Sequence, residues 1–343
     1  MCGIVGYAGY RSAAPILLQG LRRLEYRGYD SYGIATLSTE VCIHKKAGKV
    51  SELPDSPGIL QGTIGIGHTR WATHGIPSDI NAHPHQDCTD QIAVVHNGII
   101  ENYSALKRDL IGRGHIFRSD TDTEVIAHLI EEAYTGDLLE AVRNTLPLLS
   151  GSYALLIISA GENRLIAARN QSPLVLGIGD GEIFAASDIT PLLEYTSRVI
   201  YLNDGDTAEL RPDSYSVYFG DRPAEREIHE ISWTPDTIQK GGFAHFMLKE
   251  IFEQPDAIHQ AVHAVSEETL PSSLLNASSI TVVACGSSYH AGMIFRYLIE
   301  PACGIPVRLE MGSEYKYASI PFSDVIIGIS QSGETADTLA AIR

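Results

Sequence analysis

The hydrophobic pattern of this 343-residue chain changes character at residues 232–242, and this change limits the folds open to it. Before that stretch, short apolar runs alternate with turn residues, which is typical of antiparallel strands. After it, two unbroken apolar runs, at residues 280–284 and 325–329, are each followed by a loop of small residues and a helical segment. That order indicates a doubly wound parallel sheet. The polar stretch between the two parts, SWTPDTIQKGG, carries proline and glycine and predicts a linker.

The part before the linker is predicted to be an α+β domain of antiparallel sheets flanked by helices. Apolar residues recur at helical spacing in residues 12–24 and 123–134, and Asp122 is the expected N-cap of the second helix. Strands are expected at residues 64–67, 92–96, 153–159, 165–168, 174–177 and 183–186. The last two strands are expected to form a hairpin that turns at residues 179–181.

The part after the linker is predicted to be an incomplete α/β domain. It begins with a helix at residues 243–265 and has three convincing strands, whereas a doubly wound sheet usually has about five or six. We therefore expect the chain to belong to a longer protein. The predicted division is a first domain at residues 1–235, a linker at 236–242 and a partial second domain at 243–343.

Composition excludes several classes of partner. The 25 Lys and Arg residues against 42 Asp and Glu give a formal charge of −17, which argues against a protein that binds nucleic acid by neutralising phosphates. No apolar run approaches the roughly 20 residues that span a bilayer, so no membrane partner is expected. The five cysteines are scattered and form no C-x-x-C motif. This predicts reduced thiols in the cytoplasm, with neither a disulfide framework nor a zinc knuckle.

The N-terminus carries a candidate nucleophile. Cys2 follows Met1, and removal of Met1 would leave residue 2 with both a thiol and a free α-amine. That amine titrates near neutral pH, so one residue supplies a nucleophile and a general base. A lone cysteine is more often a small buried hydrophobe. The run CGIVG, which places a strand and two glycines directly after the thiol, favours the catalytic interpretation.

Three further motifs each allow a plain and a chemical interpretation. In HTRWATHG, Arg70 either belongs to an exposed basic loop or clamps a carboxylate in two hydrogen bonds. In VVHNGII, Asn97 and Gly98 form either an ordinary turn or an oxyanion hole. In SDTDTE, the acidic residues either begin a helix or hold an ammonium group. The nearby H-x-H of His83 and His85, even with His74, lacks further ligands at metal-site spacing, so no metal is expected.

Two loops after the linker suit a phosphate. CGSS at residues 285–288 and SQSGET at residues 330–335 each follow a predicted strand and open a helix. Backbone N–H groups and hydroxyls at such positions bind phosphates, although an N-cap serine is the simpler interpretation of each loop alone. No G-x-x-x-x-G-K-[ST] motif is present, so a nucleotide P-loop is not indicated.

These motifs together resemble a known family. CGIVG, LRRLEYRGYDS, HTRWATHG, NAHPH, VHNGII and SDTDTE resemble the glutaminase domain of class II glutamine amidotransferases, the N-terminal-nucleophile hydrolase type. Among them, YRGYDS and HTRWATHG point to the glutamine:fructose-6-phosphate amidotransferases. CGSSYHAG and SQSGETADT are similar to the sugar isomerase (SIS) domain that follows the glutaminase domain in that family. The resemblance implies a layered sandwich followed by a partial SIS domain.

The resemblance also implies roles for individual residues. Cys2 would attack the side-chain amide of glutamine to form a thioester, and Asn97 and Gly98 would hold the oxyanion. The remaining roles would be as follows: Arg70, Thr73, His74 and Asp122 bind L-glutamine, Arg27 orders the site, Trp71 gates an ammonia channel, and Ser288, Ser330, Gln331, Ser332 and Thr335 bind the phosphate of fructose 6-phosphate. The segment containing His83 and His85 would be a lid over glutamine.

The resemblance implies a transferase without a cofactor or metal, in which ammonia passes to fructose 6-phosphate to give glucosamine 6-phosphate, and a homodimer of the full-length protein. The isomerase acid and base residues would lie beyond Arg343, so residues 1–343 are expected to perform only the glutaminase half-reaction. Two alternatives stay open. The glutaminase could serve a different SIS acceptor, or the protein could be a sugar-phosphate sensor without enzymatic activity.

Overall fold

The structure is a computed structural model, and its chain separates into two compact units at residues 1–241 and 242–343, each described here by itself. The residues it describes are 2–25, 28–52, 60–71, 75–231, 245–267, 274, 276–315, 317–318, 324–331, 333 and 335–342. The predicted linker at residues 236–242 lies outside them.

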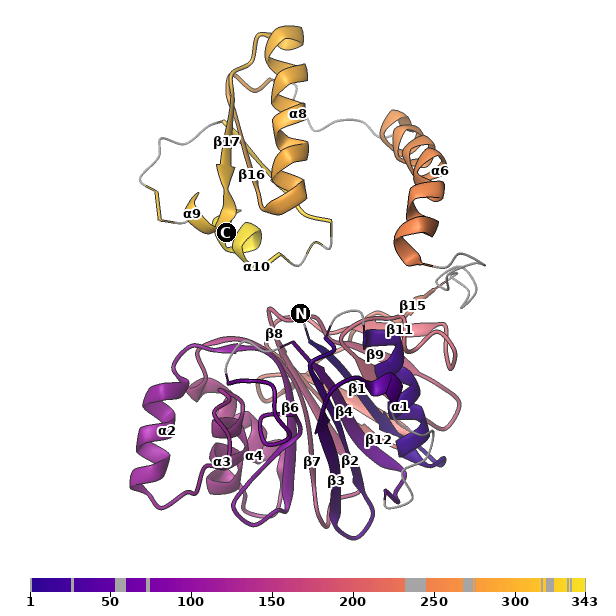
Figure 1. Ribbon diagram of the computed structural model, residues 1–343, viewed down its shortest axis with the longest axis vertical. Helices are drawn as coiled ribbons and strands as arrows, with labels where there is room; N and C mark the ends of the chain where they lie inside the picture. The colour runs from indigo at the N-terminus through magenta and orange to yellow at the C-terminus, as the bar shows by residue number, and fades with distance from the viewer. Residues whose placement is uncertain are drawn as a thin grey trace. The chain divides into compact units, whose positions relative to one another are not determined.

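The first unit contains two antiparallel sheets (Figure 1). The eight-stranded sheet has the order β15-β11-β9-β10-β1-β4-β2-β3. Its strands are β1 (Gly3–Ala8), β2 (Ser31–Leu37), β3 (Val41–Ala47), β4 (Ile64–Arg70), β9 (Val175–Ile178), β10 (Ile183–Ala186), β11 (Arg198–Tyr201) and β15 (His229–Glu230). The seven-stranded sheet has the order β14-β13-β12-β8-β7-β6-β5. Its strands are β5 (His85–Gln86), β6 (Ile92–Ile100), β7 (Gly151–Ser159), β8 (Leu165–Asn170), β12 (Asp206–Arg211), β13 (Ser214–Phe219) and β14 (Arg222–Pro223).

Helices cover the outer face of each sheet, as Figure 1 shows with α1 on one side and α2, α3 and α4 on the other. The helices are α1 (Ala13–Leu24), α2 (Tyr103–Gly112), α3 (Glu124–Ala133) and α4 (Leu138–Thr145), with short 3-10 turns η2 (Val50–Glu52) and η3 (Leu146–Leu148). Because side chains alternate along a strand, β1 sends Ile4 to the core between the sheets and Val5 to the core beneath α1. In β6, Val95 faces the core between the sheets and Val94 packs with α3 and α4. The four layers are therefore helix, sheet, sheet and helix.

The predicted sandwich of antiparallel sheets and helices is confirmed, as are the hairpin of β9 and β10 and both predicted helices of this unit. One local prediction is wrong, and one of the two interpretations of Asn97 and Gly98 is excluded. Thr123, not Asp122, is the N-cap of α3, because the Asp122 carboxylate instead accepts a hydrogen bond from the Ile100 N–H of β6 at 2.8 Å. Asn97 and Gly98 form no turn, because both continue β6 and pair with Ala154 and Tyr153 of β7.

The second unit contains a parallel sheet of three strands in the order β17-β16-β18. Its elements are α6 (Phe246–Glu267), β16 (Ile280–Ala284), α8 (Gly286–Cys303), β17 (Val307–Met311), α9 (Gly312–Tyr315), β18 (Val325–Ile329) and α10 (Ala336–Ile342). The register pairs Ala284 with both Met311 and Ile329, so the three strands end at the same edge. The predicted partial parallel α/β segment is confirmed. Within the described residues, no helix has the length and apolar character to cross a membrane.

Candidate active site

Cys2 lies immediately before β1, next to the end of β4. The antiparallel register pairs Gly3 with Thr69, which places the nucleophile candidate beside Arg70 and Trp71. The Trp71 N–H donates to Cys2 Sγ at 3.3 Å, and the thiol donates to the Trp71 carbonyl at 3.5 Å. Burial raises the pKa of the Cys2 thiol, while the Trp71 hydrogen bond and the Arg70 charge act against that rise. The backbone of Trp71 therefore holds the thiol in place. The pKa of this thiol is not lowered by its surroundings in the recess.

β6 of the second sheet brings Asn97 and Gly98 to Cys2. The Asn97 Nδ2 group donates to the Cys2 carbonyl at 3.0 Å, so this side chain ties the N-terminal strand to β6. Gly98 has φ +134°, and a Cβ built on it would lie 2.0 Å from the Ser152 carbonyl oxygen of β7. Only glycine fits at this position, both for its backbone angle and for the space.

A buried cation and a buried carboxylate share one recess with the thiol. Arg70 is 3% exposed and Asp122 is 4% exposed. Arg70 Nη2 donates to the Gly75 carbonyl at 3.0 Å. Both side chains line the recess together with Cys2, Trp71 and Gly98. The exposed-loop interpretation of Arg70 is therefore wrong, because the residue ends a buried strand.

Two histidines, His83 and His96, line this recess, and His68 and His85 pack against His83. The rings of His68 and His83 stack with centroids 4.0 Å apart, and His83 meets His85 edge-on at 4.6 Å. The Thr123 hydroxyl lies 2.9 Å from both His83 Nε2 and His96 Nδ1. Burial lowers the pKa of His68 to about 3 and also lowers the pKa of His83, His85 and His96. These imidazoles are consequently neutral at neutral pH, and Arg70 and Asp122 are the charged groups of the recess lining.

The recess brings together five of the predicted site residues from segments far apart in sequence. Asn97 contacts Cys2 without lining the recess. Arg27, Thr73, His74 and Ser332 lie outside the described residues. His83, His96, Thr121 and Thr123 also line the recess; sequence reasoning placed only the segment of His83 near glutamine, as a lid, and assigned the other three no place in the site. All four lie within motifs that had been noted (NAHPH, VVHNGII and SDTDTE), so position inside a motif was the available signal.

The two small-residue loops of the second unit leave adjacent strands at the same edge. α8 begins directly after Cys285, and Ser288 is half-buried in its first turn. Across the sheet, the Ser330 hydroxyl lies 2.8 Å from the Thr335 hydroxyl and accepts a hydrogen bond from the Gly333 N–H at 3.1 Å. Gln331 is exposed. The N-cap of α8 is Cys285, so the serine-cap interpretation does not explain the first loop.

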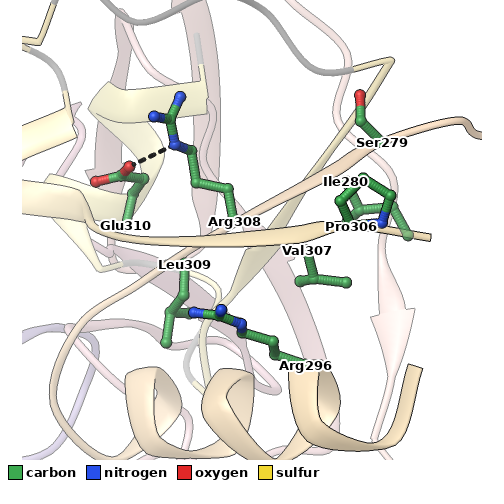
Figure 2. A pocket seen from close by; sticks show the side chains of 8 residues that line it. All are labelled: Ser279, Ile280, Arg296, Pro306, Val307, Arg308, Leu309 and Glu310. Carbon is green, nitrogen blue, oxygen red and sulfur yellow. Dashed lines mark ion pairs between the residues drawn. The ribbon is translucent and has the colours of Figure 1, made fainter. Parts of the chain in front are cut away.

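A pocket in the described part of this unit lies away from these two loops. Figure 2 shows it beside β17, where Ile280 and Val307 begin their strands and Arg296 reaches up from α8. Arg308 Nε lies 3.2 Å from Glu310 Oε1 in this pocket. Because residues 285–288 and 330–335 follow the opposite ends of the strands, none of the predicted phosphate ligands lines it. Ligands of open parallel sheets bind beyond the carboxyl ends of the strands, so we assign no function to this pocket.

Comparison with known proteins identifies both units. The glutamine amidotransferase domain family matches residues 68–194, and the SIS domain family matches residues 273–343. Glutamine--fructose-6-phosphate aminotransferase [isomerizing] of Thermococcus kodakarensis is 51% identical over 357 residues, covering 100% of this chain. The chain is a homologue of the glutamine–fructose-6-phosphate aminotransferases. The resemblance found in the sequence is thereby confirmed.

Further relatives agree with this assignment. The Aquifex aeolicus aminotransferase of the same name is 50% identical over 352 residues and also covers 100% of this chain. The chain spans 59% of the T. kodakarensis relative and 60% of the A. aeolicus relative. Among solved structures, glutamine phosphoribosylpyrophosphate amidotransferase of B. subtilis matches with a TM-score of 0.58 and 23% identity, covering 96% of this chain and 69% of that one. That likeness supports the amidotransferase fold.

Proposed function

We propose that this protein releases ammonia from glutamine at Cys2 and transfers it to fructose 6-phosphate, giving glucosamine 6-phosphate. The observation that carries the proposal is the recess in which a thiol, a buried guanidinium and a buried carboxylate line one cavity. Such a set matches free glutamine, which presents an amide to a nucleophile and carries a carboxylate and an ammonium group at its other end. The glutaminase half-reaction is proposed for residues 1–343.

Arg70 and Asp122 are proposed to hold the amino-acid end of glutamine. A guanidinium binds a carboxylate through two parallel hydrogen bonds, and a carboxylate pairs with an ammonium group. Arg70 would therefore take the α-carboxylate and Asp122 the α-amino group. Thr73 and His74, which lie outside the described residues, are proposed to line the same pocket.

Cys2 is proposed to act as both nucleophile and base. Its α-amine, free after removal of Met1, would take the thiol proton as sulfur attacks the amide carbon. The same proton would pass to the leaving nitrogen, which departs as ammonia and leaves a γ-glutamyl thioester. Water would then cleave the thioester to glutamate and restore the thiol.

Gly98 and Asn97 are proposed as the oxyanion donors. Gly98 lines the recess, and its glycine identity lets the backbone approach the reacting carbon. The Asn97 amide already donates one hydrogen to the Cys2 carbonyl. An amide NH₂ group has two hydrogens, so the second is the one proposed for the oxyanion.

Trp71 is proposed to gate the passage of ammonia. Its side chain is 48% exposed at the rim of the recess and packs edge-on against Tyr29 with centroids 5.3 Å apart. A large, half-exposed ring beside the nucleophile is placed to swing between open and closed positions. Arg27, outside the described residues, is proposed to order this region.

The second unit is proposed to bind the sugar phosphate. Ser288, Ser330, Gln331, Ser332 and Thr335 would surround it where two parallel strands end and α8 begins. We also propose that the full-length protein is a homodimer and uses no cofactor. A thiol nucleophile is readily oxidised, which favours the reducing cytoplasm as its location.

The proposal is tested by intact-mass measurement before and after incubation with the diazoketone analogue of glutamine. We expect a starting mass without Met1, then one adduct per chain that Cys2→Ala abolishes and Cys303→Ser, at an exposed thiol, retains. Loss of Met1 with no adduct would contradict catalysis at Cys2 and favour the sugar-phosphate sensor. A sugar-phosphate panel on the full-length protein distinguishes fructose 6-phosphate from a different SIS acceptor.

A further inference from the structure

We propose that Cys88, His115, His128 and Glu131 bind one zinc ion at a structural site separate from the glutamine recess. Their four donor atoms lie within 4.8 Å of one another. The residues come from three segments: Cys88 lies between β5 and β6, His115 follows α2, and His128 and Glu131 are neighbours on α3. None of the four lines the recess at Cys2.

The donor separations match the edges of a metal tetrahedron. Cys88 Sγ lies 3.5 Å from His115 Nδ1 and 3.6 Å from His128 Nδ1. Tetrahedral zinc, with bonds of about 2.3 Å to sulfur and about 2.0 Å to nitrogen, places these atoms about 3.5 Å apart. Glu131 Oε2 lies 3.1 Å from His115 Nδ1 and 3.2 Å from His128 Nδ1. Four of the six edges of the tetrahedron are thus already near the length that zinc requires.

Carboxylates stand behind both imidazoles, as they do around ligating histidines. His115 Nε2 lies within hydrogen-bond distance of Glu132 Oε1, at 3.2 Å, whereas His128 Nε2 lies 3.7 Å from Glu124 Oε1, close to it but beyond a hydrogen bond. In zinc sites, a ligating histidine donates its other ring N–H to a carboxylate, which orients the ring and strengthens the ligand. In addition, the Ile116 N–H donates to Cys88 Sγ at 3.4 Å. A backbone donor of this kind stabilises a thiolate.

The surroundings of both imidazoles are rich in groups that bind a cation. Each Nδ1 atom lies near both Cys88 Sγ and Glu131 Oε2, so the two nitrogens, the sulfur and the carboxylate oxygen face one common point. His128 is 1% exposed, which keeps water away from this point on the α3 side. A single zinc ion there would be bound by all four donor atoms at once.

The donor set selects the metal and its role. One thiolate, two imidazoles and one carboxylate form a mixed soft and borderline set that suits zinc. Four protein ligands leave no open position for substrate or water, which is typical of a structural site. The ion would cross-link α3 to the segments that carry Cys88 and His115. Because α3 begins at Glu124, two residues after Asp122, this cross-link would also stabilise the loop that places Asp122 in the recess.

The test measures zinc directly on the whole chain. After chelation, the protein is titrated anaerobically with zinc against a chromophoric competitor, and cobalt(II) is substituted to record thiolate-to-cobalt absorption. We expect one zinc per chain, at least a tenfold weaker affinity in Cys88→Ser and in His115→Gln, and a loss of about tenfold in Glu132→Gln. Cys303→Ser and His229→Gln, at an exposed thiol and an exposed imidazole, should bind zinc like the parent.

Binding of less than half an equivalent, or equal affinity in Cys88→Ser and Cys303→Ser, would overturn the proposal and leave the four side chains as a hydrogen-bonded cluster without a metal. If Cys88→Ser does not fold, alkylation of the parent decides: zinc should slow modification of Cys88 and leave that of Cys303 unchanged. Equal alkylation rates with and without zinc would also overturn it. These readouts involve no glutamine, so their failure would leave the proposed function standing.

Discussion

At the scale of single residues, Gly98 is the most constrained position of the candidate site. Its positive φ and the Ser152 carbonyl 2.0 Å from an added Cβ exclude any side chain. We predict that Gly98→Ala moves β6 away from β7, lowers the free energy of unfolding by about 1–3 kcal/mol and abolishes glutamine hydrolysis. Thermal unfolding and a glutaminase assay measure the two effects.

The matched control is Gly112→Ala at the end of α2. Nothing lies within 4 Å of the Cβ that this change adds. It should leave hydrolysis unchanged and stabilise the fold by about 0.5–1 kcal/mol, because alanine favours a helix over glycine. Equal effects of the two substitutions would contradict the role assigned to Gly98.

The burial of His68 predicts how the stability of the protein depends on pH. Its folded pKa is about 3, below the ordinary value of 6.5, because the ring is buried beside His96 and Arg70. The unfolded chain therefore binds a proton that the native chain excludes, and stability falls as pH drops through 6.5. For each such histidine the loss is about 1.4 kcal/mol per pH unit once the pH is well below that value.

Substitution of His68 isolates its contribution to the pH dependence of the free energy of unfolding. Denaturant unfolding between about pH 6 and pH 5 should show a dependence on pH that is shallower in His68→Gln than in the parent by up to about 1.4 kcal/mol per unit. The exposed His229→Gln should leave the slope unchanged. An unchanged slope in His68→Gln would show that His68 titrates alike in both states.

At the scale of elements, the start of α3 depends on a buried carboxylate. Glu124 accepts hydrogen bonds from the Arg118 N–H, the Ser119 N–H and the Ser119 hydroxyl, each at 2.7 Å. Burial opposes its charge, but the His128 ring 3.7 Å away and the hydrogen bonds from Arg118 and Ser119 lower the pKa of this carboxyl to about 2. The loop of residues 119–124, and Asp122 with it, is folded around this side chain.

We predict that Glu124→Gln lowers the free energy of unfolding at neutral pH by about 1–3 kcal/mol, because an amide replaces one acceptor oxygen with a donor facing these N–H groups. Urea unfolding measures the change. Glu140→Gln, at an exposed position in the first turn of α4, should change stability by less than about 0.5 kcal/mol. Similar losses in the two variants would mean that the loop does not depend on Glu124.

Helices and strands with a clear hydrophobic pattern were predicted correctly, and those without one were missed or cut short. Residues 183–186 and 12–24 were predicted because their apolar residues follow a regular run or a helical period. β2 was missed because SYGIATL is buried at every position and interrupted by serine and glycine, so no alternation appears in it. β6 was cut short at His96 because Asn-Gly usually marks a turn. Pairing with β7 carries the strand through both residues.

At the scale of the whole molecule, the two units have separate cores. Three buried clusters belong to residues before 241, and a fourth, around Ile280 and Val282, belongs to the second unit. We predict that residues 1–241 expressed alone fold and hydrolyse glutamine, with a Tm within about 3 °C of the first transition of the longer chain. Calorimetry of both proteins measures this. An unfolded or inactive fragment would contradict the independence of the first unit.

The sequence by itself determined the order of the two folds, the candidate for an N-terminal nucleophile and the motifs that supply most of the recess. These features are readable because periodicity, turn residues and motif spacing are local properties of the chain. Only the tertiary structure decided that Cys2 meets Trp71 and Asn97, and that Cys88 meets His115, His128 and Glu131. No short spacing links those residues. Strand register and sheet packing bring them together, and both depend on contacts between segments that lie far apart along the chain.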